Sequence, residues 1–179
     1  MPRARTFPVL LLFLFACLPA AAQESDTAPL ITRDEVKLNL AGAEQILQAA
    51  RAQAEKMKLK VNIAVVDDGG HLIAFSRMDG ARPASVYTAL TKATTAATLR
   101  QDTGPLPPGA AEPDVWLNLS VQNAAAMSGG KFTTLRGGVA IALDGQVIGA
   151  VGVGGATGEQ DAEIARAGVA ALLAAIEKE

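Results

Sequence analysis

The chain has one histidine, His71, so any chemistry that requires an imidazole depends on this residue. An imidazole can ligate a metal such as iron, or act as an acid or base near neutral pH. Arg77 follows in the same apolar segment, and its planar guanidinium suits pairing with a carboxylate. The alternative for His71 is a surface histidine beside a tight turn.

Two apolar segments around His71 predict a β-hairpin. Residues 61–66 and 71–78 are apolar, and residues 67–70 (DDGG) between them are typical of a turn. A two-residue loop at Asp68-Gly69 would pair Val66 with His71. Because side chains alternate between the two faces along a strand, one face is predicted to hold a histidine, an arginine and two apolar residues. The predicted face consists of His71, Ile73, Phe75 and Arg77.

Other charged residues have two interpretations each. Arg77 and Lys92 could each bind a carboxylate of a ligand, or form a salt bridge to a neighbour, for example Arg77 with Asp79. Asp67, Asp68 and Asp79 could group to bind iron, but an aspartate beside glycine more often stabilises a turn through local backbone hydrogen bonds. We therefore predict turn roles for Asp67 and Asp68 and leave Asp79 open.

A glycine-rich segment precedes the last predicted helix. Gly152, Gly154 and Gly155 resemble a backbone nest that attracts anions. Their spacing does not match the dinucleotide-binding pattern. Glu159 and Asp161 follow at the predicted helix start, where acidic side chains complement the helix dipole and repel phosphate. We therefore predict dipole-stabilising roles for these two residues.

The composition argues against several classes of function. The formal net charge is −2, and it falls to about −4 without Arg3 and Arg5, which opposes the phosphate neutralisation that nucleic-acid binding requires. Cys17 is the only cysteine. The sequence offers neither a nucleophile elbow nor a cysteine–histidine pair, so whether the protein is an enzyme stays open.

The N-terminus predicts export. Arg3 and Arg5 precede an apolar run over 9–18 and an A-x-A site at 20–22, as in a secretory signal peptide. The run is too short to cross a bilayer of about 30 Å as a helix. We predict a signal peptide over 1–22, a linker over 23–29, one domain over 30–179, and a periplasmic or secreted mature protein without a membrane span. An interfacial helix and a lipoprotein anchored through Cys17 are the alternatives.

The pattern along the domain predicts an α/β (α+β) fold. An apolar stripe from Val36 predicts a helix to about Lys58, with Thr32 and Glu35 as its capping box. Further helices are expected over 86–99 after Ser85, over 114–127, and from about residue 157, with a second hairpin over 138–153 turning at Asp144-Gly145. The two hairpins predict one antiparallel sheet flanked by helices.

Two sequence blocks resemble the GlcG/HbpS-like haem-binding (haem-degrading) family. The first is VVDDGGHL over 65–72, leading into RMDGA over 77–81 and KAT over 92–94; the second is DGQVIGAVGVGG over 144–155, followed by EQD over 159–161. The resemblance spans about 30–173, with a looser fit over 101–136. It implies a three-layer domain similar to profilin-like folds, assembly into homo-oligomers, and haem as cofactor or ligand, with roles in haem or iron handling.

The resemblance also suggests roles for individual residues. His71 would lie near the haem iron, Phe75 and Ile73 would contact the macrocycle, and Arg77 or Lys92 would meet a propionate. Two alternative functions remain at this point. One is an enzyme acting on haem or on a small organic acid, and the other is a non-catalytic, oligomeric envelope protein.

Overall fold

The computed structural model describes residues 35–178. The predicted signal peptide, the linker, the lipoprotein cysteine and the Thr32 cap lie outside these residues. Within the described part, no helix is long and apolar enough to cross a membrane. The elements are α1 (Leu40–Lys56), β1 (Asn62–Asp67), β2 (Leu72–Arg77), α2 (Ser85–Leu99), α3 (Val115–Met127), β3 (Gly138–Leu143), β4 (Gln146–Gly154) and α4 (Gly158–Ile176).

The four strands form one sheet in the order β2-β1-β4-β3, and every neighbouring pair is antiparallel. The two hairpins therefore join through β1 and β4, which confirms the predicted mixed α/β fold with one antiparallel sheet. The β3–β4 turn lies where expected. Asp144 and Gly145 adopt positive φ angles of 49° and 76°, as a type I′ turn requires.

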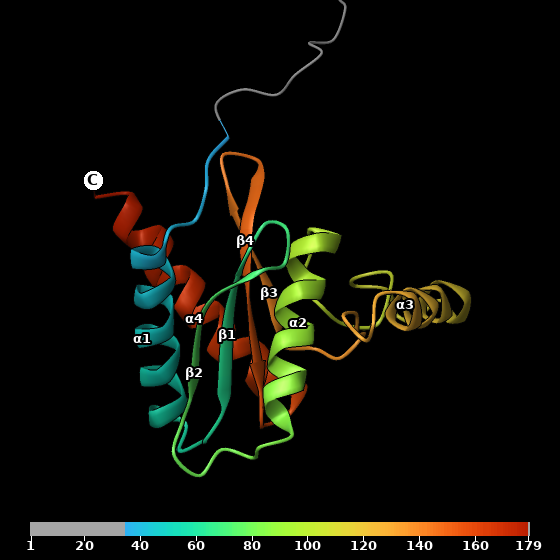
Figure 1. Ribbon diagram of the computed structural model, residues 1–179, viewed down its shortest axis with the longest axis horizontal. Helices are drawn as coiled ribbons and strands as arrows, with labels where there is room; N and C mark the ends of the chain where they lie inside the picture. Colours follow the sequence, from blue (N-terminus) through green and yellow to red (C-terminus); the bar gives the residue numbers. More distant parts are fainter. Residues whose placement is uncertain (1–34, 179) are drawn as a thin grey trace, which may run out of the picture. The chain divides into compact units, whose positions relative to one another are not determined.

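Helices cover both faces of the sheet (Figure 1). On one face, α1 and α4 pack against the larger core, which contains Ile46, Ile63 and Ile164. On the other face, α2 packs through alanines against Ala64, Val66 and other small residues. Only 4 % of the residues are aromatic, and the short side chains of this core allow close approach between helix and sheet.

The start of α1 differs from the prediction. Residues 35–39 are not helical, and the helix begins at Leu40, where the Asn39 side chain accepts a hydrogen bond of 2.9 Å from the Gly42 N–H. Asn39 satisfies an otherwise unpaired first-turn amide, so it caps the helix in place of Thr32. The predicted buried stripe is confirmed by Ala43, Ile46, Leu47, Ala50 and Ala54.

The glycines of β4 permit the contact with α2. A methyl group at Gly152 would collide with the Ala89 carbonyl of α2, and one at Gly154 would collide with Thr88 Oγ1. Backbone therefore lies directly against backbone at this face, which is the close approach that glycine within a strand indicates.

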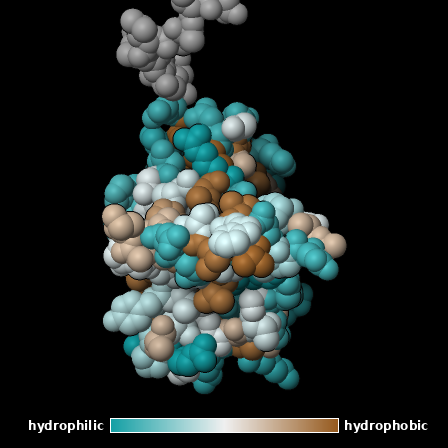
Figure 2. All heavy atoms as spheres, turned by 90° about the vertical axis from the view of Figure 1, so that its right-hand side faces the viewer, coloured by the Kyte–Doolittle hydropathy of each residue, from teal (hydrophilic) through white to brown (hydrophobic). Residues whose placement is uncertain are grey.

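Helix α3 lies away from the sheet (Figure 1). Asp114 caps it by accepting a 3.0 Å hydrogen bond from the Leu117 N–H. Only Val121 of this helix is buried, and Trp116 is 81 % exposed. Figure 2 faces the side on which α3 projects and shows apolar side chains gathered over it. This helix therefore leaves an apolar surface in contact with solvent.

Candidate functional site

His71 lies in the turn between β1 and β2, and its side chain is 83 % exposed. Asp67 shapes this turn: its Oδ1 accepts hydrogen bonds from the N–H groups of Gly69 (2.9 Å) and His71 (2.8 Å). Its other oxygen, Oδ2, lies 3.3 Å from His71 Nδ1. The predicted turn role of Asp67 is confirmed, and the same carboxylate also orients the imidazole. With Nδ1 directed to Asp67, Nε2 is available to an external partner.

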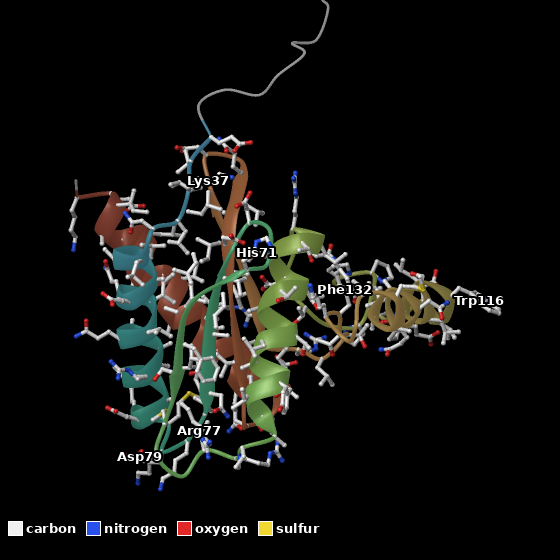
Figure 3. The ribbon with its side chains drawn as sticks, viewed as in Figure 1. Lys37, His71, Arg77, Asp79, Trp116 and Phe132 are labelled. Carbon is white, nitrogen blue, oxygen red and sulfur yellow. The ribbon has the colours of Figure 1, made fainter. Side chains whose placement is uncertain are left out.

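The neighbouring carboxylate, Asp68, faces the segment before α1. Lys37 Nζ donates a 3.0 Å hydrogen bond to Asp68 Oδ2, and this ammonium holds the pKa of the Asp68 carboxyl below its ordinary value. Asp79 lies at the opposite end of β2 (Figure 3). Within residues 35–178, no group of three His, Cys, Asp or Glu side chains is arranged to hold a metal ion. The three aspartates thus do not form an iron site.

The register of the first hairpin corrects the predicted common face. The loop has three residues, because the Asp67 N–H donates to the His71 carbonyl at 2.9 Å and Gly70 takes a φ of 81°. The pairing then shifts, so that Val66 faces Leu72 while Val65 faces Ala74, and Ile73 is the extra residue of a β-bulge.

The bulge separates residues that simple alternation would place together. Ile73 packs against the core under α1 and α4, whereas Phe75 packs against the core under α2. His71 precedes the strand and lies in the turn, so the prediction of one face with His71, Ile73, Phe75 and Arg77 was wrong. The physical reason is the inserted residue, which reverses the alternation of side chains.

Arg77 lies at the far end of β2 from His71 (Figure 3). It borders a separate surface pocket of about 540 Å³, and within residues 35–178 no ion pair joins it to Asp79. The pocket combines four basic and two acidic side chains. They are Arg51, Lys58, Lys60 and Arg77 with Glu55 and Asp79.

Lys92 is buried on the inner side of α2. Its Nζ donates hydrogen bonds to Asp161 Oδ2 at 2.7 Å and to the Val153 carbonyl at 2.8 Å. Asp161 Oδ1 accepts a further hydrogen bond of 3.1 Å from the Ala156 N–H. Lys92 thus forms a salt bridge, but its partner is distant in sequence. The prediction for Asp161 missed this pair; the only signal was that each residue falls in one of the two motif blocks.

The structure therefore does not bring the four predicted residues together. Lys92 points to β4 and α4, whereas Thr94 on the same helix donates a 3.1 Å hydrogen bond to the Gly70 carbonyl in the His71 turn. Apolar side chains follow the turn: Leu72 is 53 % exposed, and Phe75 and Leu90 both pack against the small core under α2. We name this the turn–α2 surface, defined as His71, Leu72, Phe75, Leu90 and Thr94.

The fold and these sites define a class of protein: a small α/β domain with one antiparallel sheet, an exposed histidine turn and a buried lysine–aspartate pair. The family model described as haem-degrading protein HbpS-like matches residues 38–170. The chain belongs to this family, which confirms the resemblance of the two motif blocks.

Three similar proteins illustrate the relationship. Protein GlcG of Escherichia coli (strain K12) is 41 % identical over 121 residues, covering 68 % of this chain and 84 % of GlcG. The crystal structure of Klebsiella pneumoniae ORFY superimposes with a TM-score of 0.68 at 28 % identity, covering 82 % of this chain and 99 % of ORFY. The structure of a PduOC–haem complex superimposes with a TM-score of 0.64 at 31 % identity, covering 76 % of this chain and 95 % of the PduOC chain.

Proposed function

We propose that this protein binds haem at the turn–α2 surface, with His71 Nε2 as an axial ligand of the iron. The observation that carries the proposal is the exposed imidazole with Asp67 Oδ2 3.3 Å from Nδ1. Metal-ligating histidines commonly direct their second ring nitrogen to a carboxylate, which fixes the ring and raises its basicity. The family and the haem complex of the PduOC relative support haem as the ligand.

An apolar platform lies beside this imidazole. By register, Leu72 and Phe75 both lie on the α2 side of β2, opposite Val66 and Ala64. Leu72 is exposed, and Phe75 and Leu90 are half-buried. A porphyrin face placed here would cover apolar side chains that water now contacts, which is favourable at about 25 cal/mol per Å² of apolar surface.

Arg77 and Lys92 do not suit the propionates of haem bound at this position. Arg77 lies at the other end of β2, and Lys92 is held by Asp161 on the opposite side of α2. Lys37 also reaches the turn, but its ammonium is engaged by Asp68 and Glu35. Arg100, which follows α2, is the other basic side chain near the turn, and after Lys37 it adds to the lowering of the Asp68 pKa. We assign the propionate contact to Arg100.

A hemin titration of the mature protein, followed by absorbance, tests this proposal. We expect a saturable Soret shift at a stoichiometric ratio, and loss of that shift in His71→Ala. Leu40→Ala, an exposed apolar residue at the start of α1, is the matched control for non-specific adsorption and should titrate like the parent. An identical titration of the parent and His71→Ala would rule out His71 as the ligand.

We also propose that the protein takes part in haem or iron handling, either by degrading haem or by carrying it. A haem-degrading enzyme would lose the Soret band under peroxide or reductant faster than free hemin does. A carrier would retain it. The measurement therefore separates the enzymatic alternative from simple binding without changing the proposed ligand.

We also propose that the protein is exported to the periplasm or beyond, because residues 1–22 have the composition of a signal peptide. Mass spectrometry of the protein recovered from fractionated cells should give an N-terminus at Gln23. Full-length protein in the cytoplasm would contradict export, and a lipid-modified Cys17 would identify the lipoprotein alternative.

We further propose a homo-oligomer in which α3 lies between copies. Residues 115–127 contain no charged side chain, and Val115, Trp116 and Leu119 are exposed. In a two-fold symmetric dimer, the same helix of a second copy would supply a matching apolar surface.

A further inference from the structure

A small pocket lies on the opposite side of α2 from the Thr94–Gly70 contact, where the end of β4 meets the start of α4. Its volume is about 150 Å³. Three cationic side chains and one carboxylate border it: Arg82, Lys92, Arg136 and Asp161. Gly155 and Gly158 contribute backbone to its wall. The pocket is large enough for several waters or for the carboxylate end of a small molecule.

Lys92 is the buried polar group at this pocket. Its side chain is 5 % exposed, and two of its three N–H groups are engaged by Val153 and Asp161. An ammonium has three donors, and no residue within 35–178 accepts the third. A buried donor without an acceptor costs free energy. A water or a ligand that accepts from this N–H would therefore stabilise the protein.

The charge balance of the pocket favours an anion. Asp161 neutralises Lys92, and both of its oxygens are already engaged, one by Lys92 and one by the Ala156 N–H. The guanidiniums of Arg82 and Arg136 therefore remain as the excess charge. Glu159 offsets Arg136 only weakly, because the 3.3 Å contact to Nε joins two exposed side chains.

The two arginines are held in place by contacts that leave part of each guanidinium available to a ligand. Arg82 Nε donates to Ser85 Oγ at 2.9 Å, and buried Asn62 holds the Arg82 carbonyl through its Nδ2 at 3.1 Å. Arg136 lies against Gly158, where a Cβ would come within 2.9 Å of the Arg136 Cβ. The start of α4 does not contribute to this attraction, because Thr157 and Gln160 form a capping box there and Glu159 and Asp161 complement the helix dipole.

We propose that this pocket binds the carboxylate of a small anionic ligand, with Arg82 and Arg136 as its ion-pair partners and the third N–H of Lys92 as an inner donor. The site is separate from the turn–α2 surface and does not rest on haem binding at His71. A carboxylate could come from a free organic acid or from a propionate of haem, so the test must distinguish these sources.

The experiment uses the mature protein without hemin, and follows the backbone amide NMR signals of Gly155 and Gly158 during titration with acetate or succinate. We expect saturable shifts with the acids and none with acetamide, which has a similar shape but no charge. Arg136→Gln should weaken acetate binding about tenfold, and Arg136→Lys should retain part of it. Arg51→Gln, in the separate basic pocket, should bind like the parent.

Two further titrations identify the source of the carboxylate. If hemin, but not hemin dimethyl ester, competes with acetate and shifts the same amides, the natural source is a propionate; if neither competes, it is a free acid. Absence of saturable shifts with either acid, or equal shifts with acetamide, would overturn the proposal. Arg82→Gln serves as a second variant, and retained affinity in both glutamine variants would also overturn it. Failure here would leave the hemin titration of His71 unaffected.

Discussion

At the scale of single residues, Asp67 determines how His71 is presented. One of its oxygens holds the turn and the other lies beside Nδ1 of the imidazole. Asp67→Asn keeps an acceptor for the two turn amides but removes the carboxylate charge. Because carboxylate partners of metal-bound histidines typically contribute about 10–100-fold to affinity, we expect hemin affinity to fall by about tenfold.

A hemin titration of Asp67→Asn beside Asp79→Asn measures this effect. Asp79 lies at the other end of β2 and should leave the affinity unchanged. Equal hemin affinities for the parent, Asp67→Asn and Asp79→Asn would show that the Asp67 carboxylate does not support His71 as the iron ligand.

The buried pair between Lys92 and Asp161 has a different role at this scale, because both side chains are almost fully buried. Removing one partner leaves an uncompensated charge in the interior, which typically costs about 3–5 kcal/mol. We expect Lys92→Met to lower the free energy of unfolding by about this amount. The double variant Lys92→Met with Asp161→Leu should recover much of it.

Urea denaturation of the two single variants and the double variant forms a cycle that isolates the interaction. If the loss in the double variant equals the sum of the two single losses, the residues are not coupled and the expectation is wrong.

At the scale of elements, the contact of α2 with β4 depends on the absence of a side chain at Gly152. A methyl group there would meet the Ala89 carbonyl, so one of the two backbones must move. We expect Gly152→Ala to destabilise the domain by about 1–3 kcal/mol, as overpacked cores do. Gly42→Ala is the matched control, because that position is helical and a methyl group there would meet two flexible leucine ends, with Asn39 Oδ1 at an ordinary contact distance of 3.6 Å.

Gly42→Ala should be neutral, or stabilising by up to about 1 kcal/mol, because alanine has a smaller entropy cost than glycine in a helix. Thermal unfolding of both variants tests the contrast. An unchanged melting temperature for Gly152→Ala would show that α2 can move away from the strand without cost.

The sequence predicted those elements that local chemistry controls. Asp144-Gly145 defined the second hairpin because an Asp-Gly pair between two apolar segments strongly favours a type I′ turn. The predicted register of the first hairpin was wrong at Ile73. A bulge there places both Ile73 and Ala74 against one core, and the neighbouring residues in the sequence do not indicate such packing. The pairing of Lys92 with Asp161 was missed for the same reason, since it joins residues 69 positions apart.

At the scale of the whole domain, α2 separates the two proposed sites. The turn–α2 surface offers an imidazole and apolar side chains, whereas the pocket beside α4 offers guanidiniums and a buried ammonium. A single haem cannot be assigned to His71 and Lys92 together from this arrangement. Residues of the two family motif blocks therefore lie at two separate places in the fold. His71 lies in the turn between β1 and β2, and Lys92 and Asp161 lie at the pocket beside the start of α4.

Helix α3 gives the last prediction, which concerns assembly. Trp116 and Leu119 are exposed on a helix that carries no charge. Burying a large apolar side chain typically contributes about 1.5–3 kcal/mol, so contact between copies through α3 would favour an oligomer. We expect light scattering of the mature protein to give a mass above that of one chain, and the double variant Trp116→Lys, Leu119→Lys to reduce it to one chain.

Leu40→Lys is the matched control for this double variant, because Leu40 is also exposed but lies at the start of α1. It should keep the parent mass. Circular dichroism should show that both variants remain folded, since α3 contributes only Val121 to the buried interior. A parent protein that stays monomeric at high concentration, or a double variant with the parent mass, would place the contacts between copies elsewhere or exclude them.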